Sequence, residues 1–210
     1  MSQNMRDLMR LVESQQLDEL QGVKGHAQAA APLDSHDAVI DYLESKGFKR
    51  LGDGEYGGVF DHPSFKGRYV LKVFRDPMYE AFLGYCAKHP QNPHLPKIVG
   101  KVMPIGKLAH MVRIERLQDM PKQLFVNLKL DRIVASLEWP PTSHPEQMAL
   151  QNAIQQGNLH SLYTTLMSLT QAKPGRGRID LHYGNFMLRG ETIVISDPYA
   201  GAKTVFKREY

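Results

Sequence analysis

The sequence predicts an α+β fold in which short strands precede a mostly helical second half. Between residues 48 and 117, short apolar runs are separated by glycines and by an Asp-His-Pro turn, which is typical of antiparallel strands. Between residues 120 and 172, apolar residues recur at helical spacing. Two last apolar runs, 186–188 and 193–195, are joined by Gly190 and Glu191 and indicate a β-hairpin.

Composition limits the classes of protein that need to be considered. The chain has 210 residues, 42% of them apolar, which suits one compact domain or two small lobes with an N-terminal arm. No apolar run approaches the length of a membrane span, and the polar N-terminus does not resemble a signal peptide, so no membrane partner is expected. The single cysteine, Cys86, excludes an intramolecular disulfide, suits a reducing cytoplasm and is expected to be a small buried side chain.

The net charge of +4 favours anionic partners such as nucleotide phosphates, nucleic acid or an acidic protein. No basic stripe with interleaved aromatic residues is present, and a nucleic acid is therefore not expected as a direct partner.

Three segments are expected along the chain. Residues 1–33 form an N-terminal arm, with an imperfect helical pattern over 4–21 and an Ala-rich linker over 22–33. Residues 34–117 form a first lobe with a preceding helix, and residues 118–210 form a second lobe. The arm is expected to dock on its own domain or on a partner.

A helix is predicted to open the first lobe, capped by Asp34 or Ser35 and ended by Gly47. Its helical spacing predicts that four apolar side chains are buried: Val39, Ile40, Tyr42 and Leu43.

A glycine-rich segment, Gly-x-Gly-x-x-Gly-x-Val, follows and comprises Gly52, Gly54, Gly57 and Val59. A dinucleotide-binding fold would continue into a helix, whereas here a turn and a second strand follow. Glycines in such a hairpin let backbone N–H groups approach phosphates, since no Cβ intervenes. Val59 would then cover an adenine and Tyr56 would lie at the loop tip; the alternative is a glycine-rich hairpin without a ligand.

Lys72 lies inside the apolar strand 69–74, where an ammonium is costly unless it meets an anion. The anion expected here is a nucleotide phosphate together with a helix carboxylate. Asp76 and Pro77 open a helix to about Lys88, and its Glu80 is the candidate partner of Lys72. The alternative is that Glu80 is an exposed first-turn glutamate that complements the helix dipole.

The rest of the first lobe is expected to consist of connecting strand segments over 95–99 and 101–105, and a strand over 110–117 that leads into a hinge. Backbone groups from Glu115 to Leu117 are expected to pair with the edge of an adenine.

Three helices are predicted in the second lobe. The first begins at Asp119 or Pro121 and runs to Leu137, before Trp139-Pro-Pro. The second begins with a capping box, Ser143 and Glu146, and ends at Gly157; the third is capped by Asn158 and carries a leucine-rich face. Trp139 is expected to be a packing anchor.

Three polar residues surround the last hairpin. Asp180 and Asn185 precede its first strand, and Asp197 follows its second, so both oxygen donors Asn185 and Asp197 lie at the same end. Oxygen donors are the ligands that Mg²⁺ prefers, usually together with phosphate. Asp180 stands apart, where it can accept a proton from an attacking hydroxyl. The preceding segment, residues 174–178, is either a solvated loop or an anion contact.

In order and spacing, these features resemble the protein-kinase-like superfamily over residues 46–201: a glycine hairpin, a strand lysine, a helix glutamate, a hinge, Asp-x-x-x-x-Asn and an aspartate after a strand. The sequence looks closest to the early serine/threonine protein kinases of podoviruses. These are autographivirus-type bacteriophages that carry their own RNA polymerase. Four segments carry this resemblance: residues 47–57, Asp61-His-Pro, the loop from Asp180 to Asn185, and Ile195-Ser-Asp-Pro.

The resemblance implies a minimal two-lobed kinase-like fold, with a small antiparallel N-lobe sheet plus one helix and a truncated, mostly helical C-lobe. It implies that ATP and Mg²⁺ are bound, that Lys72 orients the phosphates, that Asp180 is the catalytic base, and that Asn185 and Asp197 hold the metal. The expected substrates are host proteins in the bacterial cytoplasm, and the kinase itself by autophosphorylation.

The sequence departs from ordinary protein kinases in three ways. Asp197-Pro198-Tyr199 replaces Asp-Phe-Gly, so the usual aromatic switch residue is missing. Arg178-Ile179-Asp180 replaces His-Arg-Asp, so no arginine directly precedes the base. Because the segment after Asp197 is short, we expect neither an activation segment nor the helical platform that binds peptides, and no control by loop phosphorylation.

Two alternatives stay open. Asp180-Leu-His-Tyr-Gly-Asn185 also looks like the loop of small-molecule kinases of the aminoglycoside phosphotransferase type, although their long acid-lined insert has no counterpart here. The other alternative is a pseudokinase-like protein that modulates a host protein by contact. The joint presence of Lys72, Asp180, Asn185 and Asp197 favours an active kinase. Serine/threonine and tyrosine acceptors both remain open.

Overall fold

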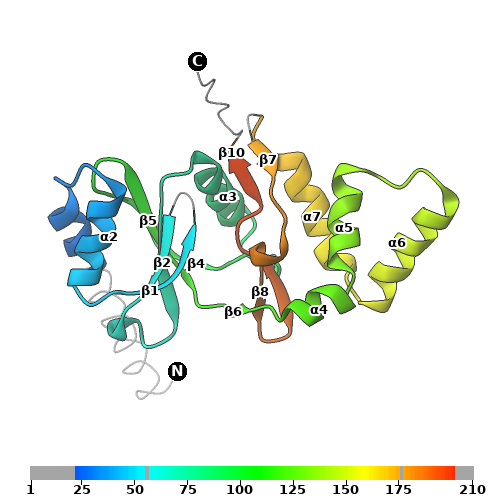
Figure 1. Ribbon diagram of the computed structural model, residues 1–210, viewed down its shortest axis with the longest axis horizontal. Helices are drawn as coiled ribbons and strands as arrows, with labels where there is room; N and C mark the ends of the chain where they lie inside the picture. The colour runs from blue at the N-terminus through cyan, green and yellow to red at the C-terminus, as the bar shows by residue number, and fades with distance from the viewer. Residues whose placement is uncertain (1–21, 55–56, 176, 202–210) are drawn as a thin grey trace, which may run out of the picture. The chain divides into compact units, whose positions relative to one another are not determined.

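The computed structural model describes residues 22–54, 57–175 and 177–201, which fall into two compact units. Of the described residues, the first unit contains those from 22 to 75 together with 98–116, and the second contains 76–97 together with those from 117 to 201. Residues 76–97, which the sequence placed in the first lobe, thus pack with the second unit. Among the described residues, no helix has both the length and the apolar character that a bilayer crossing requires. Figure 1 shows the elements of both units.

A five-stranded antiparallel sheet forms the first unit, in the order β1-β2-β3-β5-β4. Its strands are β1 (Lys49–Gly54), β2 (Gly57–Asp61), β3 (Tyr69–Phe74), β4 (Ile98–Ile105) and β5 (Ala109–Glu115). The glycine segment is a hairpin, as expected, and a short 3₁₀ turn, η1 (Pro63–Phe65), joins β2 to β3. Of the two connecting segments predicted before β5, the structure has one strand, with a register shift between Val99 and Met103.

Two helices pack against this sheet. The helix α2 (His36–Ser45) begins at Ser35, whose hydroxyl accepts the Ala38 N–H at 3.1 Å. It ends before Gly47, which has a φ of +86° that suits glycine. Tyr42, which was predicted to be buried, is only half-buried, and its hydroxyl lies 3.1 Å from Nδ1 of His26.

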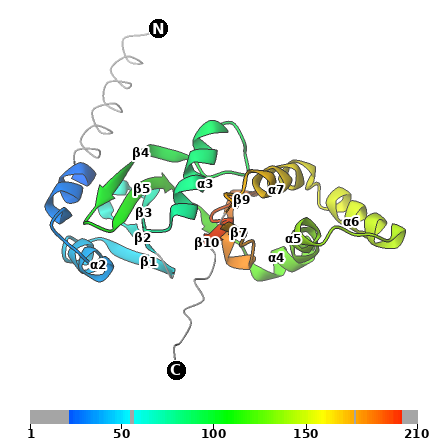
Figure 2. The same cartoon turned by 90° about the horizontal axis from the view of Figure 1, so that it is seen from above.

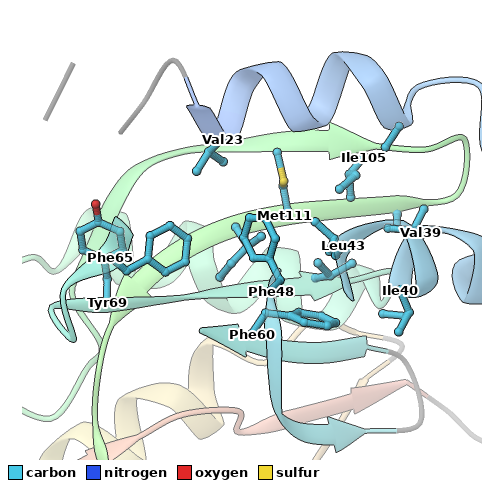
Figure 3. Close-up of a cluster of buried hydrophobic side chains, with 14 residues drawn as sticks. Val23, Val39, Ile40, Leu43, Phe48, Phe60, Phe65, Tyr69, Ile105 and Met111 are labelled. Atoms are coloured by element: carbon cyan, nitrogen blue, oxygen red, sulfur yellow. The ribbon is translucent and has the colours of Figure 1, made fainter. Parts of the chain in front are cut away.

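The prediction of a linker over residues 22–33 is wrong, since residues 22–30 are helical. The Ala-rich composition favours a helix, and packing decides the outcome because Val23 and Ala30 are fully buried. Figure 3 shows Val23 in the same cluster as Leu43, Phe60 and Met111, with helices and sheet side by side. Residues 1–21 of the predicted arm lie outside the described part of the chain.

The second unit contains five helices among its described residues: α3 (Pro77–Lys88), α4 (Lys122–Asn127), α5 (Leu130–Glu138), α6 (His144–Gln156) and α7 (His160–Ala172). Asp76 caps α3 as predicted, and its carboxylate accepts the Met78 N–H at 2.8 Å. Cys86 is buried on this helix, as predicted. The single helix predicted from residue 121 to 137 is wrong: Lys129 adopts a φ of +54° and separates α4 from α5.

Two further predictions in this region are wrong. Asn158 does not cap α7 but ends α6, because it has a φ of +52° and the Leu159 N–H returns to the Ile154 carbonyl at 2.8 Å. This is a Schellman ending, in which asparagine takes the place of glycine. Trp139 is not a packing anchor, since its side chain is 73% exposed at the end of α5. The capping box of Ser143 and Glu146 is present.

Two small antiparallel sheets complete the second unit. One joins β6 (Gln118–Asp119), β8 (Phe186–Arg189) and β9 (Thr192–Ile195), and the other pairs β7 (Gly177–Ile179) with β10 (Tyr199–Gly201). The hairpin of β8 and β9 was predicted, whereas β6 and the pairing of β7 with β10 were not. Figure 2 shows β7 and β10 beside α3 and α7, with α6 farther away. The predicted α+β class is confirmed, since an antiparallel sheet with packed helices forms the first unit and the second unit is mostly helical.

We predict that Gly57→Ala lowers the free energy of unfolding by about 1–3 kcal/mol, the usual cost of overpacking. A Cβ at residue 57 would collide with the Val73 carbonyl oxygen, because β2 and β3 approach closely there. The matched control is Gly52→Ala in the same hairpin, where a Cβ meets no atom within 4 Å. Urea unfolding of both variants measures the difference; equal midpoints would contradict the prediction.

Candidate active site

Asp180, Asn185 and Asp197 are brought together by the backbone of the second unit. The Asp180 N–H donates to the Pro198 carbonyl at 2.8 Å, and the Ser196 N–H donates to the Asn185 carbonyl at 2.9 Å. The loop before β8 is therefore bonded at two points to the segment after β9. This places the three residues at one end of the hairpin, which is the end that the sequence indicated.

The side chain of Asn185 closes this arrangement. Its Nδ2 donates to the Asp180 carbonyl at 2.6 Å, across the turn η2 (Tyr183–Asn185). Because Nδ2 is engaged, Oδ1 is the remaining polar atom of the amide, and no donor to it is found among the described residues. An oxygen held in this way is a suitable ligand for a hard cation.

Asp197 follows β9 directly and is half-buried. Its charge acts on the buried Tyr79 of α3: burial raises the pKa of Tyr79 well above its usual value, and the Asp197 carboxylate and Cys86 raise it further. No cluster of three or more His, Cys, Asp or Glu side chains that suits a metal occurs in the described part of the chain. Asn185 and Asp197 together fit Mg²⁺ that is completed by phosphate oxygens, which is how Mg²⁺ is usually held in nucleotide sites.

The carboxylate of Asp180 is paired with Arg178, at 3.2 Å between Nη1 and Oδ1. The Asp180 side chain is 30% exposed and that of Arg178 is 51% exposed, so the pair is weak and easily exchanged. Part of the segment before Asp180 is ordered, since Arg178 belongs to β7 and the Lys173 ammonium donates to the Gly177 carbonyl at 2.7 Å. A contact of this segment with an anionic ligand stays a prediction.

The loop between α3 and β4 is bonded to the β8–β9 hairpin, a role that no pattern in the sequence indicates. His94 is bonded twice to β9, since its Nδ1–H donates to the Ile193 carbonyl at 2.8 Å and its own carbonyl accepts the Ile195 N–H at 2.9 Å. Arg189 in turn donates to the carbonyls of Pro93 at 2.8 Å and Leu95 at 2.9 Å. These bonds hold β8 and β9 against the loop that follows α3, and they thereby help to fix the positions of Asn185 and Asp197.

In the first unit, Lys72 lies in a row with two valines. Val59 of β2 and Val112 of β5 are its direct partners across the sheet. Residues 71 and 73 point into the core under α2, so Lys72 and its two partners lie on the opposite face. The lysine therefore lies on the apolar face of the sheet that is opposite to α2.

The glycine hairpin and the hinge are found in the same unit. Gly52 and Gly54 lie in β1 and Gly57 opens β2, whereas Glu55 and Tyr56 lie outside the described residues. At the hinge, Glu115 ends β5, and the Arg116 N–H donates to the Arg68 carbonyl at 3.2 Å. The Arg116 amide is thus engaged within the sheet, so of the hinge residues it is the least suited to pair with an adenine; the roles of Glu115 and Leu117 remain predictions.

Glu80 lies in the first turn of α3 and is exposed. This agrees with the alternative in which it complements the helix dipole. Its pairing with Lys72 would join residues of the two different units and remains a prediction.

No family model matches the chain, and no curated protein matches it. Among solved structures, the chain is similar to aminoglycoside phosphotransferase APH(4)-Ia, at 14% identity and a TM-score of 0.36, covering 80% of this chain and 74% of that chain. A thermostable mutant of the same protein gives 15% identity and a TM-score of 0.36, covering 76% and 71%.

A third similar structure is spectinomycin phosphotransferase APH(9)-Ia in complex with ADP and spectinomycin, at 15% identity and a TM-score of 0.33, covering 73% of this chain and 64% of that chain. At such low identities and TM-scores, the similarity does not indicate an activity or a substrate.

We predict that stability falls as the pH drops below 6.5, in part through His94. Burial lowers the pKa of His94 below its usual 6.5, the nearby Arg189 lowers it further, and the hydrogen bond to Ile193 partly opposes both. The unfolded chain then takes up the proton first, so the stabilisation by neutral His94 is present above pH 6.5 and is lost as the pH falls toward the folded pKa.

His94→Asn, which keeps a donor near the Nδ1 position, should flatten this decline. The free energy of unfolding in urea, measured from pH 8 to pH 5, gives the size of the decline. The difference between variant and wild type at pH 8 gives the effect of the substitution on packing alone. A variant that loses as much stability as the wild type between pH 7 and pH 5 would contradict the assignment.

Proposed function

We propose that this protein is an ATP- and Mg²⁺-dependent kinase-like phosphotransferase that transfers the γ-phosphate of ATP to serine or threonine hydroxyls of proteins. The observation that supports it most is the arrangement of Asp180, Asn185 and Asp197 at one end of the β8–β9 hairpin. One potential base and two oxygen donors in fixed positions meet the needs of phosphoryl transfer, which depends on positioning and charge neutralisation.

Each residue has a defined part in the proposed reaction. The Asp180 carboxylate leaves Arg178, accepts the proton of the acceptor hydroxyl and thereby lets the oxygen attack the γ-phosphorus, with ADP as the leaving group. Asn185 Oδ1 and the Asp197 carboxylate hold the metal. When bound, Mg²⁺ supplies charge neutralisation on the β- and γ-phosphates.

The first unit supplies the nucleotide contacts in this proposal. Lys72 orients the α- and β-phosphates and pairs with Glu80, and the glycines of the β1–β2 hairpin approach the phosphates. Val59 lies directly opposite Lys72 and would cover the adenine from the same face of the sheet. An ammonium between two valines, on a face of the sheet that is otherwise apolar, is suited to an anionic ligand.

For the acceptor, host bacterial proteins and the protein itself are the first candidates, in line with the resemblance to the kinases of autographivirus-type phages. A second candidate is a small-molecule acceptor. It is favoured by the Leu-His-x-Gly order between Asp180 and Asn185, in which His182 Nδ1 accepts the Gly184 N–H at 3.1 Å and shapes the turn.

We predict that ATP with Mg²⁺ raises the melting temperature, and that ATP with EDTA raises it much less. Ligand at one hundred times its dissociation constant contributes about 2.7 kcal/mol of stability. Asp197→Ala should abolish the part that depends on Mg²⁺, because it removes the only carboxylate proposed as a ligand. Glu191→Ala, at the other end of the same hairpin, is the matched control and should keep the full shift. A full shift in Asp197→Ala would place the metal elsewhere.

We predict that Asp180→Asn retains the nucleotide-dependent shift while phosphate transfer falls about 10²-fold or more, the usual scale for a lost general base. The backbone bonds of residue 180 do not involve its carboxylate, so the substitution leaves the loop intact. Labelled ATP, Mg²⁺ and a bacterial lysate provide the assay.

The same assay separates the candidates. Labelled proteins that depend on Asp180 support the protein kinase, and labelled small molecules support the second candidate. If the wild type binds ATP with Mg²⁺ but labels nothing, the protein is a nucleotide-binding interaction protein, and the proposal of catalysis is wrong.

A further inference from the structure

The residue two positions after Asp197 is a buried tyrosine that spans two helices of the second unit. Tyr199 is 3% exposed, and its O–H donates to the carbonyl of Leu169 on α7 at 2.8 Å. Its ring meets Phe82 of α3 edge-on, with ring centroids 6.1 Å apart. Figure 1 shows β10, which carries Tyr199, beside both α3 and β7. Tyr199 therefore contacts α3 on one side and α7 on the other.

The hydroxyl of Tyr199 is held inside the second unit, where its hydrogen bond to the Leu169 carbonyl is buried. A buried hydrogen bond of this kind is costly to break without a replacement partner. The contact with Leu169 is therefore a fixed point of the segment.

Only Pro198 separates Tyr199 from Asp197. The ring of Pro198 restricts φ, and its carbonyl accepts the Asp180 N–H at 2.8 Å. Tyr199 itself is paired with Ile179 in the β7–β10 sheet. To move Asp197 away, the chain would have to withdraw a buried aromatic ring, break the bond to Leu169 and separate the two strands.

We propose that Tyr199 is a positioning residue: by anchoring β10 to α3 and α7, it fixes the Asp197 carboxylate beside Asn185, so that the metal site is permanently assembled and not switched. This inference rests on the proposed function. It assigns a role to the segment Asp197-Pro198-Tyr199, which stands in place of the usual Asp-Phe-Gly. Pro198 restricts the backbone directly after Asp197, and Tyr199 carries a hydroxyl, which phenylalanine lacks.

The test is Tyr199→Phe, which removes only the hydroxyl. Tyr163→Phe is the matched control, because Tyr163 is half-buried on α7, the helix that Tyr199 contacts, and makes no hydrogen bond through its hydroxyl among the described residues. Two quantities are measured: the Mg²⁺ concentration that gives half of the ATP-dependent rise in melting temperature, and the NMR hydrogen-exchange rate of the Asp180 amide in the apo protein.

We expect Tyr199→Phe to raise the half-saturating Mg²⁺ concentration about fivefold, the scale of one lost hydrogen bond, and to speed up exchange of the Asp180 amide by a similar factor. The small rise caused by ATP with EDTA should not change, and Tyr163→Phe should match the wild type in both measurements. Unchanged Mg²⁺ dependence and exchange in Tyr199→Phe would overturn the proposal. So would an increase in exchange that is uniform over the whole second unit, which would mark Tyr199 as a general stability residue.

A failure of the proposed role of Tyr199 can be distinguished from a failure of the proposed phosphotransferase function. If the wild type shows no Mg²⁺-dependent rise at all, the phosphotransferase proposal fails. The exchange measurement, which needs no ligand, still decides whether Tyr199 fixes the segment: no faster exchange in Tyr199→Phe than in Tyr163→Phe would overturn the anchoring itself.

Discussion

The hydrogen bond from the Asn185 side chain to the Asp180 carbonyl is the interaction on which the candidate site depends. It spans a short turn whose residues do not pair with a neighbouring strand. It fixes Asp180, the proposed base, relative to Asn185, a proposed metal ligand. The bonds from Asp180 to Pro198 and from Ser196 to Asn185 then connect this turn to the segment that carries Asp197. A polar side chain that replaces a missing backbone partner is a common way of ordering such a loop. Here it leaves one amide oxygen available for a ligand.

This local arrangement is rigid because it is held on two sides by helices of the same unit. On one side, Tyr199 joins β10 to α7 through Leu169. On the other side, the loop after α3 holds the hairpin through His94 and Arg189, and Asn92 of the same loop donates to the buried Thr165 of α7 at 3.0 Å. Sites in which polar groups are held by a second layer of hydrogen bonds keep their geometry better than sites on free loops. The unit thus positions its carboxylates before any ligand arrives.

The first unit has a different character, because its proposed ligand groups lie on a regular sheet. Strand register alone places Val59, Lys72 and Val112 side by side, and the packing of Leu71 and Val73 under α2 decides which face they occupy. Gly57 has a reason to be glycine that is independent of any nucleotide, since β3 leaves no space for a Cβ. A glycine pattern of this kind can therefore serve the sheet and a phosphate at once, and its presence alone does not separate the two.

The sequence by itself determined the local elements and the grouping of the polar residues. Alternating apolar residues, Asp76, the capping box at Ser143 and the turn at Gly190 specify their strands and helices because these signals act within a few residues. The spacing of Asp180, Asn185 and Asp197 around one hairpin likewise follows from short-range geometry.

Only the tertiary structure decided the features that depend on distant partners. The segment 22–30 is a helix because Ala30 is buried against the core of the sheet. The helix is interrupted at Lys129 although the apolar spacing continues, and the short strands β7 and β10 form only by pairing with each other. The supporting contacts of His94 and Tyr199 join residues far apart in the chain, to carbonyl groups that every residue carries. A backbone acceptor has no sequence signature, and for this physical reason such contacts are decided by the fold alone.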